Sequence, residues 1–148
     1  MSFSILKQKI DRSAQFNFGL GASSNEIDNA QELLNIPLQG SYRLFLQEFG
    51  WLDTGVIEIY GLGSDVPKHL NLVDITRSER TEMHPPLLHH LIPVMNDGSG
   101  NLYCIDSRPK GIGAIVFWDH DLNADQEPEF VALSFEKWLY EKLCNIDK

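Results

Sequence analysis

The chain has 148 residues, of which 43% are hydrophobic and 22% are charged. This length and composition are typical of one globular domain and exclude an intrinsically disordered chain, which would be poor in apolar residues. Twenty-one Asp and Glu against twelve Lys and Arg give a net charge of −9, which repels phosphates, so we expect no direct binding to nucleic acid or to a membrane.

The longest apolar stretch, residues 111–118, is far shorter than the roughly 20 residues that cross a bilayer. The N-terminus alternates apolar and charged residues and has no signal-like hydrophobic region. Cys104 and Cys144 are expected to be reduced thiols and not a disulfide. We therefore expect a cytoplasmic protein with neither a secretion signal nor a membrane span.

Helical spacing of apolar residues predicts three helices in the first third of the chain. The first covers residues 3–12, and the second is capped by Ser23 or Ser24. The third begins at Gly40 and ends on Gly50, a left-handed C-cap residue. The second helix is predicted to bury one stripe of side chains: Ile27, Ala30, Leu33 and Leu34.

A period of two predicts strands in the remainder of the chain. The first covers residues 56–60, and an antiparallel meander follows with strands at 91–95, 102–106 and 114–118. No dependable structure is predicted for residues 65–91, because their apolar residues fit either a helix or a strand and a double proline interrupts the segment. A last helix is predicted to begin after the N-cap residue Ser134.

The segment 119–130 places oxygen-bearing side chains at the alternating positions of a calcium-binding loop. Ala124, however, replaces the glycine that the sharp turn of such a loop needs, and Phe130 replaces its bidentate acid. The pattern therefore favours a solvated acidic loop that joins a strand to the last helix. We expect neither a metal ion nor a cofactor.

Other motifs also favour structural roles. The glycines of residues 97–101 are typical of a hairpin turn and lack the Lys and Ser or Thr of a phosphate-binding loop. His84, His89 and His90 cluster without the spacing of a zinc site. The sequence contains no serine-hydrolase elbow, and neither cysteine begins a recognisable helix. The sequence therefore predicts no catalytic residue and no enzymatic activity.

The charge pattern stands out in the last third of the chain. Residues 111–136 contain six acidic side chains and no Lys or Arg, and five of the six lie within residues 119–129. Two interpretations remain open on these residues alone. The segment is either a solvated loop or a surface for a basic partner.

The order of motifs resembles the SUKH superfamily. Residues 36–50, IPLQGSYRLFLQEFG, resemble the hallmark helix of that family, and four further blocks follow in the family's order: GVIEIYGLG (55–63), IPVMNDGSGNLYCID (92–106), GAIVFWDHD (113–121) and SFEKWL (134–139). The resemblance covers residues 24–143. It implies a single α+β domain over residues 1–148, with N-terminal helices and a C-terminal helix packed around a twisted antiparallel sheet.

The resemblance also implies a function. Many bacterial SUKH proteins are immunity proteins that neutralise nuclease or other toxins, and a eukaryotic branch includes a cell-wall-assembly regulator. We therefore hypothesise that this chain binds and neutralises a basic cognate toxin of the nuclease type by protein–protein contact. The alternatives are a non-catalytic regulatory, scaffold or ligand-binding module and, third, a cryptic hydrolase.

The hypothesis predicts the contact residues. Carboxylates would take the place of the phosphates of a nuclease's substrate. Trp118 is a candidate aromatic anchor, with burial in the core as its alternative role. The predicted acidic contacts are Asp119, Asp121, Asp125, Glu127 and Glu129.

Overall fold

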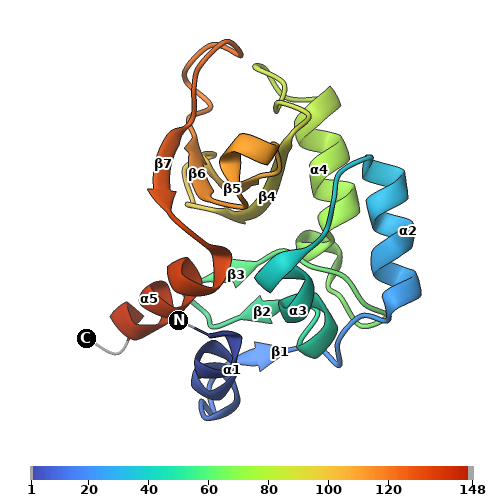
Figure 1. Ribbon diagram of the computed structural model, residues 1–148, viewed down its shortest axis with the longest axis vertical. Helices are drawn as coiled ribbons and strands as arrows, with labels where there is room; N and C mark the ends of the chain where they lie inside the picture. Colours follow the sequence, from blue (N-terminus) through green and yellow to red (C-terminus); the bar gives the residue numbers. More distant parts are fainter. Residues whose placement is uncertain (1, 147–148) are drawn as a thin grey trace.

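Residues 2–146 are described by a computed structural model, in which helices pack against two antiparallel sheets and leave one sheet edge open (Figure 1). The strands are β1 (Asn17–Phe18), β2 (Leu52–Asp53) and β3 (Glu58–Ile59) in a small sheet, and β4 (Leu91–Asn96), β5 (Leu102–Asp106), β6 (Ile115–Trp118) and β7 (Glu129–Ala132) in a larger one. The N–H of Tyr60 donates to the carbonyl of Val94 (2.9 Å), which joins the two sheets. The predicted α+β class is confirmed.

The first two helices, α1 (Phe3–Asp11) and α2 (Ser24–Leu34), follow the prediction closely. Ser23 and Glu26 form a capping box at the start of α2, in which each side chain accepts the other residue's N–H at 3.1 Å. The predicted buried stripe is wrong at Leu33, which is 57% exposed. Leu33 points about 100° away from Leu34 around the helix axis and lies outside the face that α2 buries with Ile27, Ala30 and Leu34.

The third helix, α3 (Gly40–Glu48), carries the most buried aromatic side chains of the N-terminal half. Gly50 follows it with φ of 79°, which confirms the predicted left-handed C-cap position. The hydroxyl of Tyr42 donates to the carbonyl of Tyr60 (2.6 Å) and thereby ties α3 to the end of β3. Burial raises the pKa of Tyr42, so this hydroxyl stays protonated.

The strand predicted over residues 56–60 is confirmed only at β3, which is shorter. The residues before it form a turn instead. The Thr54 hydroxyl accepts the N–H groups of Val56 (3.3 Å) and Ile57 (2.9 Å), and the Thr54 N–H donates back to the carbonyl of Ile57 (2.9 Å). This local hydrogen bonding competes with the sheet and leaves Val56 exposed.

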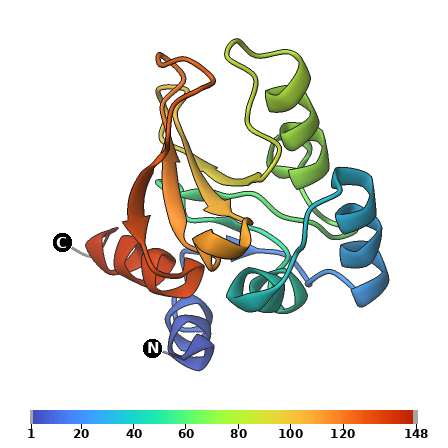
Figure 2. The same cartoon turned by 45° about the horizontal axis from the view of Figure 1, so that its top comes forward.

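The segment between residues 65 and 91 contains η1 (Lys68–Leu70) and α4 (Leu72–Thr81). Asn71 caps α4 by accepting the N–H of Asp74 (3.1 Å). Helix α4 packs against α2 and β4, as both views show (Figures 1 and 2). The Arg80 guanidinium donates to the carbonyls of Leu34 (2.8 Å) and His89 (2.9 Å), so it joins the end of α2 to the loop after α4.

The larger sheet confirms the predicted meander at β4, β5 and β6, and η2 (Pro109–Gly111) lies in the connection from β5 to β6. Strand β7 is an addition to the prediction. It pairs with β6 with a register shift between Ile115 and Val116, and it forms the edge of the sheet (Figure 2). The strand has only four residues, and most of them are exposed. The alternation of buried and exposed side chains that predicts a strand is therefore missing.

The last helix, α5 (Phe135–Ile146), begins at the predicted cap, where the Ser134 hydroxyl accepts the N–H of Lys137 (3.2 Å). It packs against α1, α3 and β7. The ring of Phe135 lies 4.9 Å from that of Tyr42 and 5.4 Å from that of Phe45, so aromatic contacts hold α5 to α3. No helix within residues 2–146 is long and apolar enough to span a membrane.

Candidate protein-binding site

The loop of residues 119–129, called the acidic loop below, connects β6 to β7 at one end of the larger sheet (Figures 1 and 2). Gln126 organises this loop from within. Its amide oxygen accepts the N–H of Asp119 (3.1 Å), and its amide nitrogen donates to the carbonyls of Asp119 (2.8 Å) and Asn123 (3.2 Å). The loop therefore has a defined backbone path on which its acids are displayed.

The structure brings the five predicted acidic residues together on this one loop. Asp121, Asp125, Glu127 and Glu129 are exposed, whereas Asp119 is partly buried. Asp119 has a local role as well, because its carboxylate accepts the N–H of Asp121 (2.9 Å). Four of the five carboxylates are thus accessible to a partner, and the fifth supports the shape of the loop.

Trp118 is not available as an aromatic anchor. Its side chain is 1% exposed, and its backbone pairs with Leu102 in the middle of the sheet. The alternative role in the core is the one that the structure confirms. A strand alternates its side chains between two faces, and the face of β6 that carries Trp118 is covered by the rest of the fold.

Apolar side chains that sequence reasoning missed flank the acidic loop. Phe130 and Leu133 are each 59% exposed, Leu122 is 52% exposed and Val131 is 38% exposed. Three of them lie on or directly after β7. The available signal was the short apolar run of residues 130–133 between Pro128 and the cap residue Ser134, which indicates a strand but does not show that it is exposed.

The hairpin turn of residues 96–101 lies beside the acidic loop and adds to its charge. The N–H of His120 donates to the side-chain oxygen of Asn101 (3.2 Å), and Gly100 approaches the His120 ring so closely that an added Cβ would lie 3.1 Å from it. Burial acts to raise the pKa of Asp97, but hydrogen bonds from Asn101 and Ser99 outweigh it and lower that pKa. Asp97 is therefore a further negative charge at this end of the sheet.

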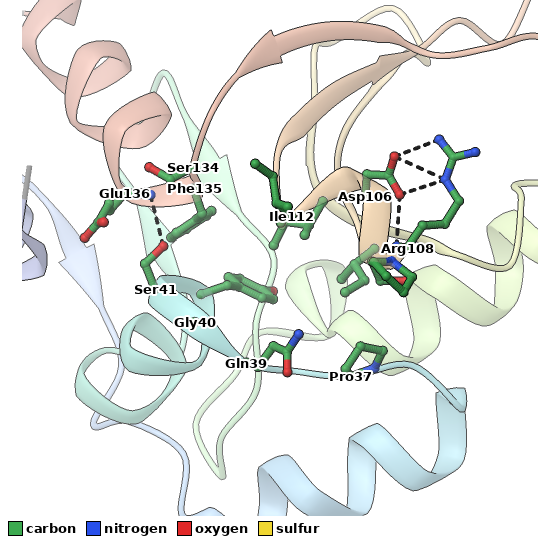
Figure 3. Close-up of a pocket in the computed structure, with 16 residues that line it drawn as sticks. Pro37, Gln39, Gly40, Ser41, Asp106, Arg108, Ile112, Ser134, Phe135 and Glu136 are labelled. Atoms are coloured by element: carbon green, nitrogen blue, oxygen red, sulfur yellow. Dashed lines mark hydrogen bonds and ion pairs between the residues drawn. The ribbon is translucent and has the colours of Figure 1, made fainter.

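A cavity of about 690 Å³ lies between the start of α3, the loop after β5 and the start of α5. The Ser41 hydroxyl accepts the N–H of Glu136 (3.2 Å) at one end of it, and Asp106 and Arg108 lie at the other end (Figure 3). Ile112 lies on the rim, 74% exposed, with φ of 46°. A left-handed backbone is costly for a β-branched residue, so the neighbouring structure holds this apolar side chain at the mouth of the cavity.

Arg108 connects the cavity to the acidic loop. It donates to the buried carboxylate of Asp106 (2.8 Å) and to the exposed carboxylate of Glu127 (2.9 Å). Burial acts to raise the pKa of Asp106, but the hydrogen bonds and the charge of Arg108 outweigh it and lower that pKa. A Cβ on Gly111 would overlap the Asp106 carboxyl group, so this approach requires glycine.

Cys104 and His90 are the potentially reactive side chains near the larger sheet, and the fold encloses the first fully and the second partly. Cys104 is fully buried, and burial raises the pKa of its thiol well above its ordinary value, so the thiol is protonated and a poor nucleophile. Burial likewise lowers the pKa of His90, with a further contribution from Arg108. Within residues 2–146 no group of three or more His, Cys, Asp and Glu side chains is placed to hold a metal ion.

The fold and this surface define a class of protein: an α+β domain that presents an acidic loop and an exposed apolar strand at one edge of its sheet. The family model described as SUKH_5, SMI1-KNR4 cell-wall, matches residues 4–144. The chain belongs to this family, and the predicted resemblance is confirmed. No curated protein matches the chain at a significant level.

Proposed function

We propose that this protein is a non-catalytic immunity protein that binds a basic toxin, of the nuclease type, and neutralises it by direct contact. One observation carries the proposal. The acidic loop exposes Asp121, Asp125, Glu127 and Glu129 next to the exposed ring of Phe130. Membership of the SUKH family is consistent with a protein partner.

The chemistry of this surface suits such a partner. A nuclease binds its substrate through Lys and Arg side chains that face phosphates, and closely spaced carboxylates offer those cations an alternative ligand. The net charge of −9 attracts a basic protein over distance and raises the rate of encounter. In this proposal Phe130, which is 59% exposed beside Glu129, takes the anchoring role for which Trp118 was one candidate, because aromatic side chains that a partner buries are frequent at binding hot spots.

The alternative proposal is a regulatory or ligand-binding module of the cell-wall-regulator type. The cavity of about 690 Å³ favours it, because this volume is within the usual range for small-molecule pockets. A search for bound metabolites or peptides, by mass spectrometry of the protein purified from its own cells, separates the two. A ligand that Ile112→Asp displaces supports this module, and binding only to a neighbouring toxin supports immunity.

The experiment that tests the immunity proposal removes the charge of the acidic loop. Replacing its five acids by Asn or Gln should slow association with the toxin encoded beside the gene, by about tenfold or more at low salt, and should flatten the salt dependence of that rate. Stopped-flow association rates and survival of cells that co-express the toxin are the measurements. The five replaced residues are Asp119, Asp121, Asp125, Glu127 and Glu129.

A matched control changes the net charge equally at other exposed positions: Asp11, Glu32, Glu48, Asp74 and Glu141. This control should lower the association rate only slightly, because its charges are removed away from the contact. Equal rates for the two variants would contradict the assignment of the acidic loop. A wild-type protein that neither binds the toxin nor protects the cell would contradict the immunity function itself.

A further inference from the structure

We infer that β7 is a docking strand, to which an extended segment of the partner adds as a further antiparallel strand of the larger sheet. The inference rests on the proposed function in one respect, namely that the partner is a basic protein. It adds the mode of binding, the backbone that is recognised and the direction of the bound segment.

The topology leaves one edge of the larger sheet open. Within residues 2–146, β7 pairs with β6 on one side and no strand lies on its other side. The opposite edge is covered, because Tyr60 bonds to the β4 carbonyl of Val94 and α4 packs against β4. The small sheet offers only two-residue strands. Strand β7 is therefore the edge at which a new strand can find unpaired backbone groups.

The side chains of β7 suit a covered edge better than a solvated one. Exposed edges are usually protected by short length, bulges, Lys, Pro or inward-pointing charges. Strand β7 is short and its pairing with β6 contains a register shift, but it carries no Lys or Pro and exposes Phe130 and Val131, with Leu133 directly after it. Phe130 pairs with Val116 and Glu129 with Phe117, so neighbouring side chains of β7 leave opposite faces of the sheet. An added strand would thus meet the ring of Phe130 on one face and the carboxylate of Glu129 on the other.

The charges specify the chemistry and direction of the added segment. The acidic loop lies at the N-terminal end of β7, where Glu129 is exposed, whereas the first turn of α5 beyond its C-terminal end carries Glu136 and Lys137, whose charges offset each other. In an antiparallel pair the C-terminal end of the new strand lies beside the N-terminal end of β7. The partner segment should therefore carry apolar residues first and Lys or Arg at its C-terminal end. A second copy of this chain is disfavoured, because each copy has a net charge of −9.

The test uses a synthetic peptide of about eight residues, the length of an ordinary strand, that alternates Thr and Val and carries Lys in place of its last two Thr. Two control peptides have the same composition. One carries the Lys residues at its N-terminal end, and the other is methylated on alternate backbone nitrogens, which blocks strand pairing but keeps charge and side chains. Binding to the full chain is followed by NMR titration and by hydrogen exchange of the amides of residues 129–132.

The first peptide should bind and slow exchange at these amides, and each control should bind about tenfold more weakly. Phe130→Thr combined with Leu133→Thr should weaken binding to a similar degree. Leu20→Thr, a change at a remote side chain that is 87% exposed, should not. Circular dichroism establishes that the variants remain folded.

Three results would overturn the inference. Equal binding of the methylated peptide, with unchanged exchange at residues 129–132, would show a charged contact without strand addition and would leave the proposed function intact. No binding of any peptide at millimolar concentration would exclude strand addition, while cell survival with the toxin decides the immunity function separately. Protection of the same amides in the protein alone, increasing with its concentration, would identify a second copy as the occupant.

Discussion

Asp106 is a carboxylate whose charge is held inside the fold. It is 4% exposed and accepts hydrogen bonds from the backbone N–H of Arg108 (3.0 Å) and from its guanidinium. Sequence patterns place Asp106 at the end of a strand, but they do not show that Arg108, two residues later, turns back to bind it. The folded structure therefore decides which charged side chains form ion pairs and which remain exposed to a partner.

Asp106→Asn should lower the free energy of unfolding at pH 7 by about 1–3 kcal/mol, because it removes a hydrogen-bonded charge from Arg108. The pKa of Asp106 is lowered in the fold from an ordinary value of 3.8. The unfolded state therefore binds the proton first, and the stabilisation is present above pH 3.8 and lost as the pH falls through the lower, folded pKa. Urea unfolding between pH 7 and pH 2.5 measures both effects.

The variant should lose less stability than the wild type over this acidic range. Asp28→Asn is the control, because Asp28 pairs with Arg43 (2.9 Å) at the surface and such pairs contribute little. Parallel pH profiles for the wild type and Asp106→Asn would show that Asp106 does not contribute in this way.

At the scale of elements, the end of α3 crosses the end of β3 at two glycines. Gly50 has φ of 79°, and a Cβ on Gly61 would overlap the carbonyl oxygen of Gly50. The N–H of Leu62 donates to that same carbonyl (3.0 Å). The family's hallmark helix and its glycine-flanked strand are thus joined by backbone contact. This gives a physical reason for glycine in both sequence blocks.

Gly61→Ala should lower the free energy of unfolding by about 3 kcal/mol or more, because backbone atoms cannot move aside as a side chain can. Thermal unfolding followed by circular dichroism measures the change. Gly98→Asn is the control, since Gly98 has a positive φ in open space that Asn tolerates. A loss at Gly61→Ala no larger than the loss at Gly98→Asn would contradict the close crossing.

The elements differ in how far their sequences predict them. Helices α3 and α5 each bury an apolar stripe and each has one clear end signal, Gly50 after α3 and Ser134 before α5, so local patterns suffice. Helix α4 follows an uninformative segment, and β7 is short and exposed. Both form because neighbouring elements supply their partners, α2 and β4 for α4, and β6 for β7. The exposed β7 therefore shows no alternating burial, whereas the apolar residues of α4 fit a helix or a strand equally when read alone.

At the scale of the whole molecule, α1 is part of the core. Leu6 and Ile10 are 0% exposed and α1 packs against α5, which brings the first and last helices together (Figure 1). The sequence resemblance begins only at residue 24, whereas the family match begins at residue 4. Helix α1 is therefore part of the family's domain, although none of the sequence blocks lies in it.

Leu6→Ala or Ile10→Ala should each lower the free energy of unfolding by about 2–5 kcal/mol, through lost apolar burial and the cavity left behind. Ile5→Ala on the same helix is the control, because Ile5 is 43% exposed. Urea unfolding of the full chain is the measurement. Similar losses at Leu6 and Ile5 would contradict a buried role for α1.

The sequence alone determined the α+β class, the helices α1, α2, α3 and α5, the meander of β4 to β6 and the position of the acidic loop. These features depend on residues that are near neighbours in the chain, such as helical stripes, caps and turns. Only the tertiary structure decided that Trp118 is buried, that Phe130 is exposed on β7, and that Arg108 pairs with Glu127. Burial and ion pairing depend on groups that folding brings together from distant parts of the chain, so local patterns do not contain them.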